Sequence, residues 1–264
     1  MVSSHDGVDQ SFTQASALDV ESGTAPPPTP DVARRLFGGQ LSLAEHYVAL
    51  LADTGISHGL VGPRERPRLW DRHVLGCAVL TDAIAKPATV IDLGSGAGLP
   101  GLVLAIRRPD LAITLVEPLH RRVVWLIDTV SALDLPNVEV HEGRAESRWT
   151  GPRVDVVTAR AVARIGMLAR WSLPMLAGEG RLLALKGSSA QTELDEDGAI
   201  LRAAGAVSWG VSQLGTDLLD QPATLVTVSA GHTPVLLESG AQATGVRASQ
   251  RRSAAGSRRG GRPK

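Results

Sequence analysis

The chain has 264 residues, with 27 lysines and arginines against 27 aspartates and glutamates, so its formal net charge is zero. Hydrophobic residues make up 43% of it and the mean hydropathy is +0.04, which is typical of a globular protein. No apolar run is long enough for a membrane-spanning helix, and the acidic start lacks the positive charges of an export signal. The single cysteine, Cys77, excludes an intrachain disulfide and a zinc site built from several cysteines. We expect a cytoplasmic protein.

The neutral total conceals an uneven distribution of charge. Residues 1–31 carry five acids and no base, whereas residues 240–264 carry seven bases and no acid. Both ends hold few large apolar side chains, so we expect a disordered leader over 1–30 and a disordered tail over 237–264. The basic charges at 247–264 are candidate contacts for RNA phosphates.

Two helical stripes of apolar residues come before the glycine-rich part of the sequence. One lies within residues 32–53 and the other within 68–84. Glycines and a proline predict a loop between them, at 54–63. We therefore expect residues 31–87 to form an N-terminal helical extension.

Beyond this extension, short apolar strands alternate with helices, which predicts an α/β domain over residues 88–236. The order is typical of a Rossmann-like fold, a mostly parallel sheet with helices on both faces, which binds ligands beyond the carboxyl ends of its strands. The expected strands are 89–93, 112–116, 138–140, 155–157 and 181–185, with a closing pair at 206–207 and 223–228. The expected helices are 99–108, 119–133 and 165–177.

The most informative segment runs from residue 90 to 101, VIDLGSGAGLPG. Its alternating glycines directly follow the first strand, where the backbone bends sharply and passes close to a ligand. The pattern G-x-G-x-x-G over 96–101, with Glu117 downstream, is by itself a weak dinucleotide signal. The carboxylate of Asp92, directed into this loop, would repel a pyrophosphate but suits a ligand that carries an ammonium and a sulfonium.

The segment resembles the S-adenosylmethionine pocket of class I methyltransferases, in which Glu117 would accept hydrogen bonds from the ribose hydroxyls. A narrower resemblance, over about 40–230, is to the bacterial 16S rRNA guanine-N7 methyltransferases, also called glucose-inhibited division protein B. The segments that carry it are LGSGAGLPG at 93–101, GRAE at 143–146, TARA at 158–161, ALKG at 184–187 and WDRH at 70–73. The two charged ends lie outside the family pattern.

The resemblance implies transfer of a methyl group from S-adenosylmethionine to N7 of guanine 527 of 16S rRNA, either in free rRNA or in the 30S subunit. It implies cofactor contacts at Gly94, Leu99, Arg160 and the pair Ala145 and Glu146. The full set of cofactor-binding candidates is Asp92, Gly94, Gly96, Gly98, Leu99, Glu117, Ala145, Glu146 and Arg160. We expect a monomer that does not bind membranes.

Guanine N7 has a free lone pair and no proton to lose, so the reaction requires no general base and rests on positioning. Arg160, Lys186 and His73 are candidates for orienting the substrate. The seven histidines are scattered, and we expect no metal site. Two alternatives remain at this point, a methyltransferase for a small molecule or protein, and a nicotinamide-dependent oxidoreductase.

Overall fold

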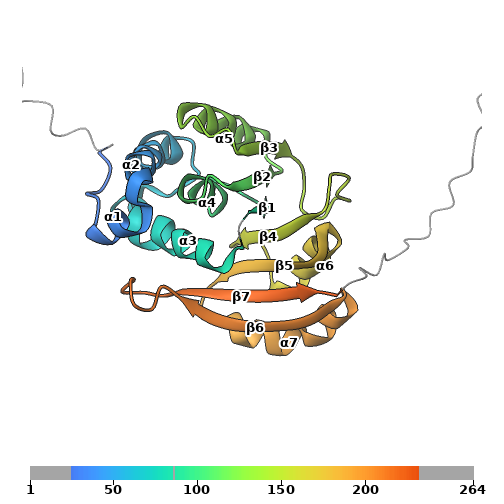
Figure 1. Cartoon of the computed structure of the whole chain (residues 1–264). Helices are drawn as coiled ribbons and strands as arrows, with labels where there is room; N and C mark the ends of the chain where they lie inside the picture. The colour runs from blue at the N-terminus through green and yellow to red at the C-terminus, as the bar shows by residue number, and fades with distance from the viewer. Residues whose placement is uncertain (1–24, 86, 232–264) are drawn as a thin grey trace, which may run out of the picture.

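The protein is described by a computed structural model over residues 25–85 and 87–231 (Figure 1). Most of the predicted leader and the whole of the predicted basic tail lie outside these residues. Their expected disorder therefore stays a prediction.

The N-terminal part is helical, but its helices are short and interrupted. The elements are α1 (Asp31–Phe37), η1 (Gly38–Gln40), α2 (Leu41–Leu50), η2 (Leu51–Gly55), η3 (Pro63–Arg68), η4 (Leu69–Val74), α3 (Leu75–Ala78) and η5 (Val79–Ala83). The loop predicted from residue 54 is shorter than expected, because helical backbone continues through Ser57. Gly55 is buried at the end of η2, with the side chains of Leu51 and Trp125 close to it.

Strands alternate with helices in the remainder of the chain. The elements are β1 (Ala88–Leu93), α4 (Gly101–Arg107), β2 (Leu111–Glu117), α5 (His120–Ala132), β3 (Val138–Glu142), β4 (Val154–Arg160), α6 (Ile165–Ser172), η6 (Leu173–Met175), β5 (Leu176–Lys186), α7 (Ala190–Ala203), β6 (Ala206–Leu214) and β7 (Ala223–Ala230). Every predicted strand is present. Helix α7 is not among the predicted elements because only four of its residues are buried, which leaves a weak apolar stripe.

The strands form one seven-stranded sheet in the order β3-β2-β1-β4-β5-β7-β6. The first five are parallel, and β7 runs antiparallel to both β5 and β6. The predicted fold class, a mostly parallel sheet covered by helices, is confirmed. No helix among the described residues is long and apolar enough to cross a membrane.

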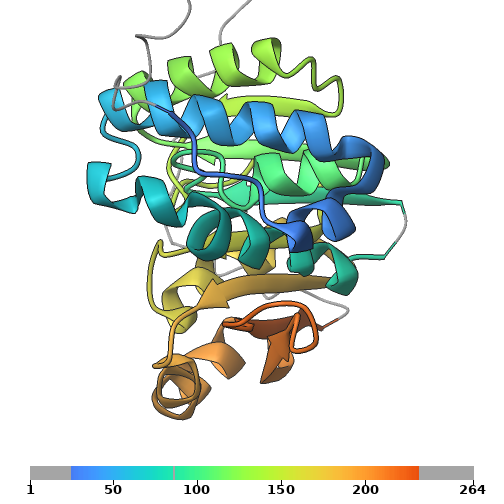
Figure 2. The same cartoon turned by 90° about the vertical axis from the view of Figure 1, so that its left-hand side faces the viewer.

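Helices cover the sheet on both faces (Figure 1). The N-terminal helices pack with α4 and α5 on one face, which Figure 2 shows toward the viewer, while α6 and α7 lie on the other. Neighbouring strand residues alternate between two apolar cores, as Val90 and Ile91 do in β1. The helical extension and the sheet therefore share one core.

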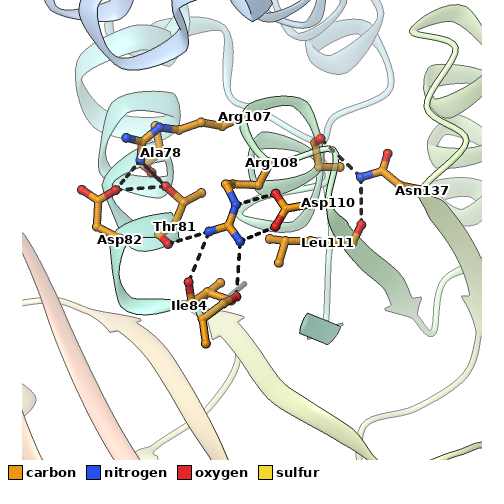
Figure 3. Close-up of polar contacts among 11 residues, drawn as sticks. Ala78, Thr81, Asp82, Ile84, Arg107, Arg108, Asp110, Leu111 and Asn137 are labelled. Atoms are coloured by element: carbon orange, nitrogen blue, oxygen red, sulfur yellow. Dashed lines mark hydrogen bonds and ion pairs between the residues drawn. The ribbon is translucent and has the colours of Figure 1, made fainter. Parts of the chain in front are cut away.

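A polar network ties α4 to η5 at the edge where β1 and β2 begin (Figure 3). Arg108 donates two hydrogen bonds to Asp110, of 2.6 and 2.7 Å, and further bonds to the carbonyl oxygens of Thr81, Ile84 and Ala85. Arg107 donates to the carbonyl oxygen of Ala78 at 2.6 Å. This network secures the edge of the sheet opposite the glycine loop.

Candidate active site

The turn between β1 and α4 needs its glycines. Gly94, Gly96 and Gly98 have φ values of 67, 57 and 84°, in the left-handed region that side chains rarely adopt. A Cβ atom on Gly98 would lie 2.3 Å from the side chain of Leu102. The loop therefore depends on backbone conformations that only glycine supplies without strain.

A cavity of about 500 Å³ opens where β1, β2 and β4 end. Its walls include six of the residues predicted from the sequence, drawn from the WDRH segment, the glycine loop after β1 and the ends of β2 and β4. They are His73, Gly94, Gly96, Leu99, Glu117 and Arg160. The fold thus brings together groups that lie up to 87 residues apart in the chain.

Glu117 ends β2 and is almost completely buried. One carboxylate oxygen accepts a 3.0 Å hydrogen bond from the backbone N–H of Gly96, and the other accepts one of 3.1 Å from Leu119. The guanidinium of Arg122 lies 3.8 Å from the same carboxylate. A carboxylate has about four lone-pair sites, so Glu117 keeps capacity for further donors such as ribose hydroxyls.

Asp92 lies behind the glycine loop rather than on the cavity wall. One of its oxygens accepts a 3.0 Å hydrogen bond from the N–H of Gly101, while the other is buried without a partner among the described residues. Burial raises the pKa of Asp92 to about 7, although the bond from Gly101 opposes the shift. Asp92 thus bonds to the first residue of α4, and a direct ligand contact for it stays a prediction.

His73 is held between two charged side chains at the cavity wall. Its Nδ1 lies 2.9 Å from Nη2 of Arg160, and its Nε2 lies 2.9 Å from a carboxylate oxygen of Glu65. Arginine only donates, so Nδ1 must accept, and the proton sits on Nε2 and is donated to Glu65. Burial lowers the pKa of His73, although the bond to Glu65 acts in the opposite direction. The lowered pKa favours this neutral form.

Lys186 was predicted as a candidate for orienting the substrate. In the structure its ammonium group bonds to other parts of the protein. Its Nζ lies 2.7 Å from a carboxylate oxygen of Glu193 and donates a 2.8 Å hydrogen bond to the carbonyl oxygen of Ala163. These contacts connect the segment after β4 to α7, and Lys186 does not line the cavity. Because these tertiary partners engage the ammonium group, the geometry gives no support to a substrate-orienting role for Lys186, which stays a prediction.

Three further cofactor candidates lie off the cavity wall. Gly98 supports the loop through its backbone conformation. Ala145 is buried beyond the end of β3, and the carboxylate of Glu146 pairs with Arg144 at 2.9 Å on the surface. Cofactor contacts at these three positions stay predictions.

Two residues that shape the site are missing from the sequence-based predictions. Glu65 lines the cavity and fixes His73, and the hydroxyl of Tyr47 bonds to the glycine loop. The signal for Glu65 was a lone acid in the arginine-rich segment 63–68. Tyr47 is the only tyrosine in the chain, which could have marked it for attention. Its position in the apolar stripe of its helix instead indicated an ordinary core residue.

The mostly parallel sheet with its reversed seventh strand, and the glycine loop facing Glu117, define a class I methyltransferase. The apo S-adenosylmethionine-dependent methyltransferase SibL shares the fold, with a TM-score of 0.51 and 18% sequence identity, over 70% of this chain and 62% of that chain.

Sequence comparison then identifies the family. The family model of GidB, rRNA small subunit methyltransferase G, matches residues 40–218. The ribosomal RNA small subunit methyltransferase G of Salinispora tropica is 49% identical over 215 residues, 79% of this chain and 89% of the relative. That of Thermobifida fusca is 50% identical over 213 residues, 81% of this chain and 89% of the relative. The chain belongs to the rRNA small subunit methyltransferase G family, as the resemblance predicted.

Proposed function

We propose that this protein transfers a methyl group from S-adenosylmethionine to N7 of a guanine in 16S rRNA, the guanine at position 527 by family resemblance. One observation carries the proposal. The family-specific glycine loop and the buried carboxylate of Glu117 form two walls of a single cavity of about 500 Å³. Both features lie within the segment that matches the family.

The residues around the cavity fit S-adenosylmethionine in size and chemistry. Gly94 and Gly96 present backbone without side-chain obstruction, and Glu117 presents a carboxylate to ribose hydroxyls. Leu99 adds an apolar wall, and Arg160 adds a cation at the end of β4. S-adenosylmethionine supplies an electrophilic methyl group when it is bound.

The chain needs only to position the guanine and exclude water from it. N7 attacks with its own lone pair, so no residue has to remove a proton. This agrees with a site in which neutral His73 has both ring nitrogens engaged, one by Glu65 and one by Arg160. His73 therefore positions neighbouring side chains and does not transfer a proton.

The alternatives weighed from the sequence fit less well. A nicotinamide oxidoreductase would place a pyrophosphate against the loop that Asp92 supports, and the family match excludes that class. A methyltransferase for a small molecule or protein would share the pocket. It disagrees with a chain that is about half identical to rRNA methyltransferases over four-fifths of its length.

We further propose that the protein acts as a monomer in the cytoplasm on 16S rRNA, either free or within the 30S subunit. The helical extension over 31–87 and the methyltransferase domain over 88–236 share a core, which supports one folding unit. The basic charges at 247–264 are proposed to add contacts to RNA phosphates.

The test uses 30S subunits that lack the modification and a donor with a labelled methyl group. Incubation with the full chain is expected to place label on one guanine of 16S rRNA, as N7-methylguanine. Unlabelled rRNA, or label on a different atom, would overturn the proposal. The variant Glu117→Ala serves as the inactive comparison.

A further inference from the structure

The charged groups of the cavity wall divide between its two sides. Glu117 and Arg122 lie at and beyond the end of β2, while Arg160 ends β4 and is joined by His73 and Glu65. The sheet order places β1 and its glycine loop between these two strands. Each side thus holds one acid and one cation, with the buried Glu117 at the end of β2 and Arg160 at the end of β4.

This division orients the methyl donor. With the ribose hydroxyls at Glu117, the methionine part extends across the glycine loop toward β4. The segment after β4 touches the loop, since a Cβ atom on Gly94 would lie 2.8 Å from the side chain of Val162. The methionine part carries a carboxylate, and Arg160 is the guanidinium on that side of the cavity wall.

The side chain of Arg160 is held at this position by hydrogen bonds to the WDRH segment. Its Nη2 donates to Nδ1 of His73 at 2.9 Å and to the carbonyl oxygen of Arg72 at 3.0 Å. Its Nη1 donates to the carbonyl oxygen of His73 at 2.9 Å and to Sγ of Cys77 at 3.4 Å, so the Nε–H and the positive charge are left for the methyl donor. The guanidinium is therefore anchored to η4, the helical turn that carries the WDRH segment.

Glu65 keeps the imidazole acceptor aimed at Arg160. By accepting the Nε2 proton, it leaves the Nδ1 lone pair free for the guanidinium. Without Glu65, the ring is free to carry its proton on Nδ1 or to rotate. Either change removes the acceptor that Arg160 uses.

We propose that Glu65 and His73 are positioning residues that hold Arg160 for the carboxylate of the methyl donor. The inference rests on the proposed function and deepens it, because it assigns the methionine part of the donor to the β4 side of the cavity. It also gives the otherwise unexplained acid of the arginine-rich segment 63–68 a role in cofactor binding.

The test compares two ligands by calorimetry on the full chain. S-adenosylhomocysteine retains the amino-acid part, whereas 5′-methylthioadenosine lacks it. His73→Leu and Glu65→Ala are expected to weaken S-adenosylhomocysteine about tenfold and to change 5′-methylthioadenosine less than about twofold. His73→Asn, whose amide oxygen can replace Nδ1 as acceptor, is expected to restore most of the affinity.

Arg68→Ala is the matched control, because Arg68 lies 4.0 Å from Glu65 but does not bond to His73. Thermal melts identify any variant that fails to fold, and Glu65→Ala, whose side chain is partly exposed, is the safer of the two. Equal weakening of both ligands, or unchanged affinity for S-adenosylhomocysteine, would overturn the inference. So would a raised KM for 30S subunits alone, which would assign Arg160 to an RNA phosphate. A wild-type chain that binds neither ligand would instead refute the proposed function.

Discussion

The hydroxyl of Tyr47 donates a 2.6 Å hydrogen bond to the carbonyl oxygen of Ala97, fifty residues further along the chain. Tyr47 lies on α2 and is fully buried, while Ala97 is in the glycine loop. Burial raises the pKa of Tyr47 well above its ordinary value, so the hydroxyl stays protonated and remains a donor. The N-terminal helices therefore take part in shaping the cofactor site.

Tyr47→Phe is expected to lower the free energy of unfolding by about 1 to 3 kcal/mol, because it leaves a buried carbonyl without its donor. Affinity for S-adenosylhomocysteine should fall several-fold as the loop loosens. Chemical denaturation and calorimetry measure the two effects. Ser57→Ala, which removes an exposed hydroxyl at the end of the same helical segment, should change neither. A Phe variant with both quantities unchanged would show that the bond contributes nothing.

Gly98→Ala is expected to reduce affinity for S-adenosylhomocysteine more than about tenfold. The new Cβ atom would combine an unfavourable positive φ with a clash against Leu102. Gly178→Ala is the control, since its Cβ would meet no atom within 4 Å. Equal affinities for the two variants would contradict the strained geometry of the loop.

Asp92 gives stability a distinct dependence on pH. Its folded-state pKa of about 7 lies above the ordinary value of 3.8, so the folded chain keeps a proton that the unfolded chain loses. This group therefore lowers stability as pH rises from about 4 to 7, by on the order of 4 kcal/mol in total.

Asp92→Asn, which cannot ionise, should remove that decline. We expect the variant to gain stability relative to wild type at pH 8 and to differ little at pH 4, as measured by urea denaturation at both values. The same loss of stability with rising pH in wild type and Asn variant would show that Asp92 is not its source.

Arg108→Met tests the network of Figure 3 at the edge opposite the cavity. The substitution removes a bidentate pair with Asp110 and bonds to three carbonyl oxygens, so unfolding should become easier by about 2 to 3 kcal/mol. Affinity for S-adenosylhomocysteine at 25 °C should hold within about twofold. Arg34→Met, which breaks an exposed pair with Asp31, should cost less than about 1 kcal/mol. Similar losses in the two variants would contradict a structural role for the network.

The basic tail predicts a salt dependence of RNA binding. Replacing the seven bases of 240–264 with glutamine keeps the length of the tail and removes its charge. The slope of log affinity against log salt should flatten by up to roughly 5, because fewer counterions are released from phosphates. An unchanged slope would exclude phosphate contacts by this segment.

Much of the fold was predictable because residues that are buried at regular intervals appear in the sequence as periodic apolar patterns. All seven strands follow from short apolar runs, and the glycine loop follows from alternating glycines directly after the first strand. Helix α7 escaped prediction because its side chains are mostly exposed, so its place depends on packing against α6 rather than on its own pattern.

The sequence by itself determined the class of fold, the family and the glycine loop, because each is recognised from short segments of consecutive residues. Only the tertiary structure decided which charged groups face the cavity. Lys186 lies against Glu193, Asp92 lies behind the loop, and Glu65 lines the cavity beside His73. A charged side chain bonds to whichever partner the fold brings within about 3 Å, and those partners lie far away in sequence.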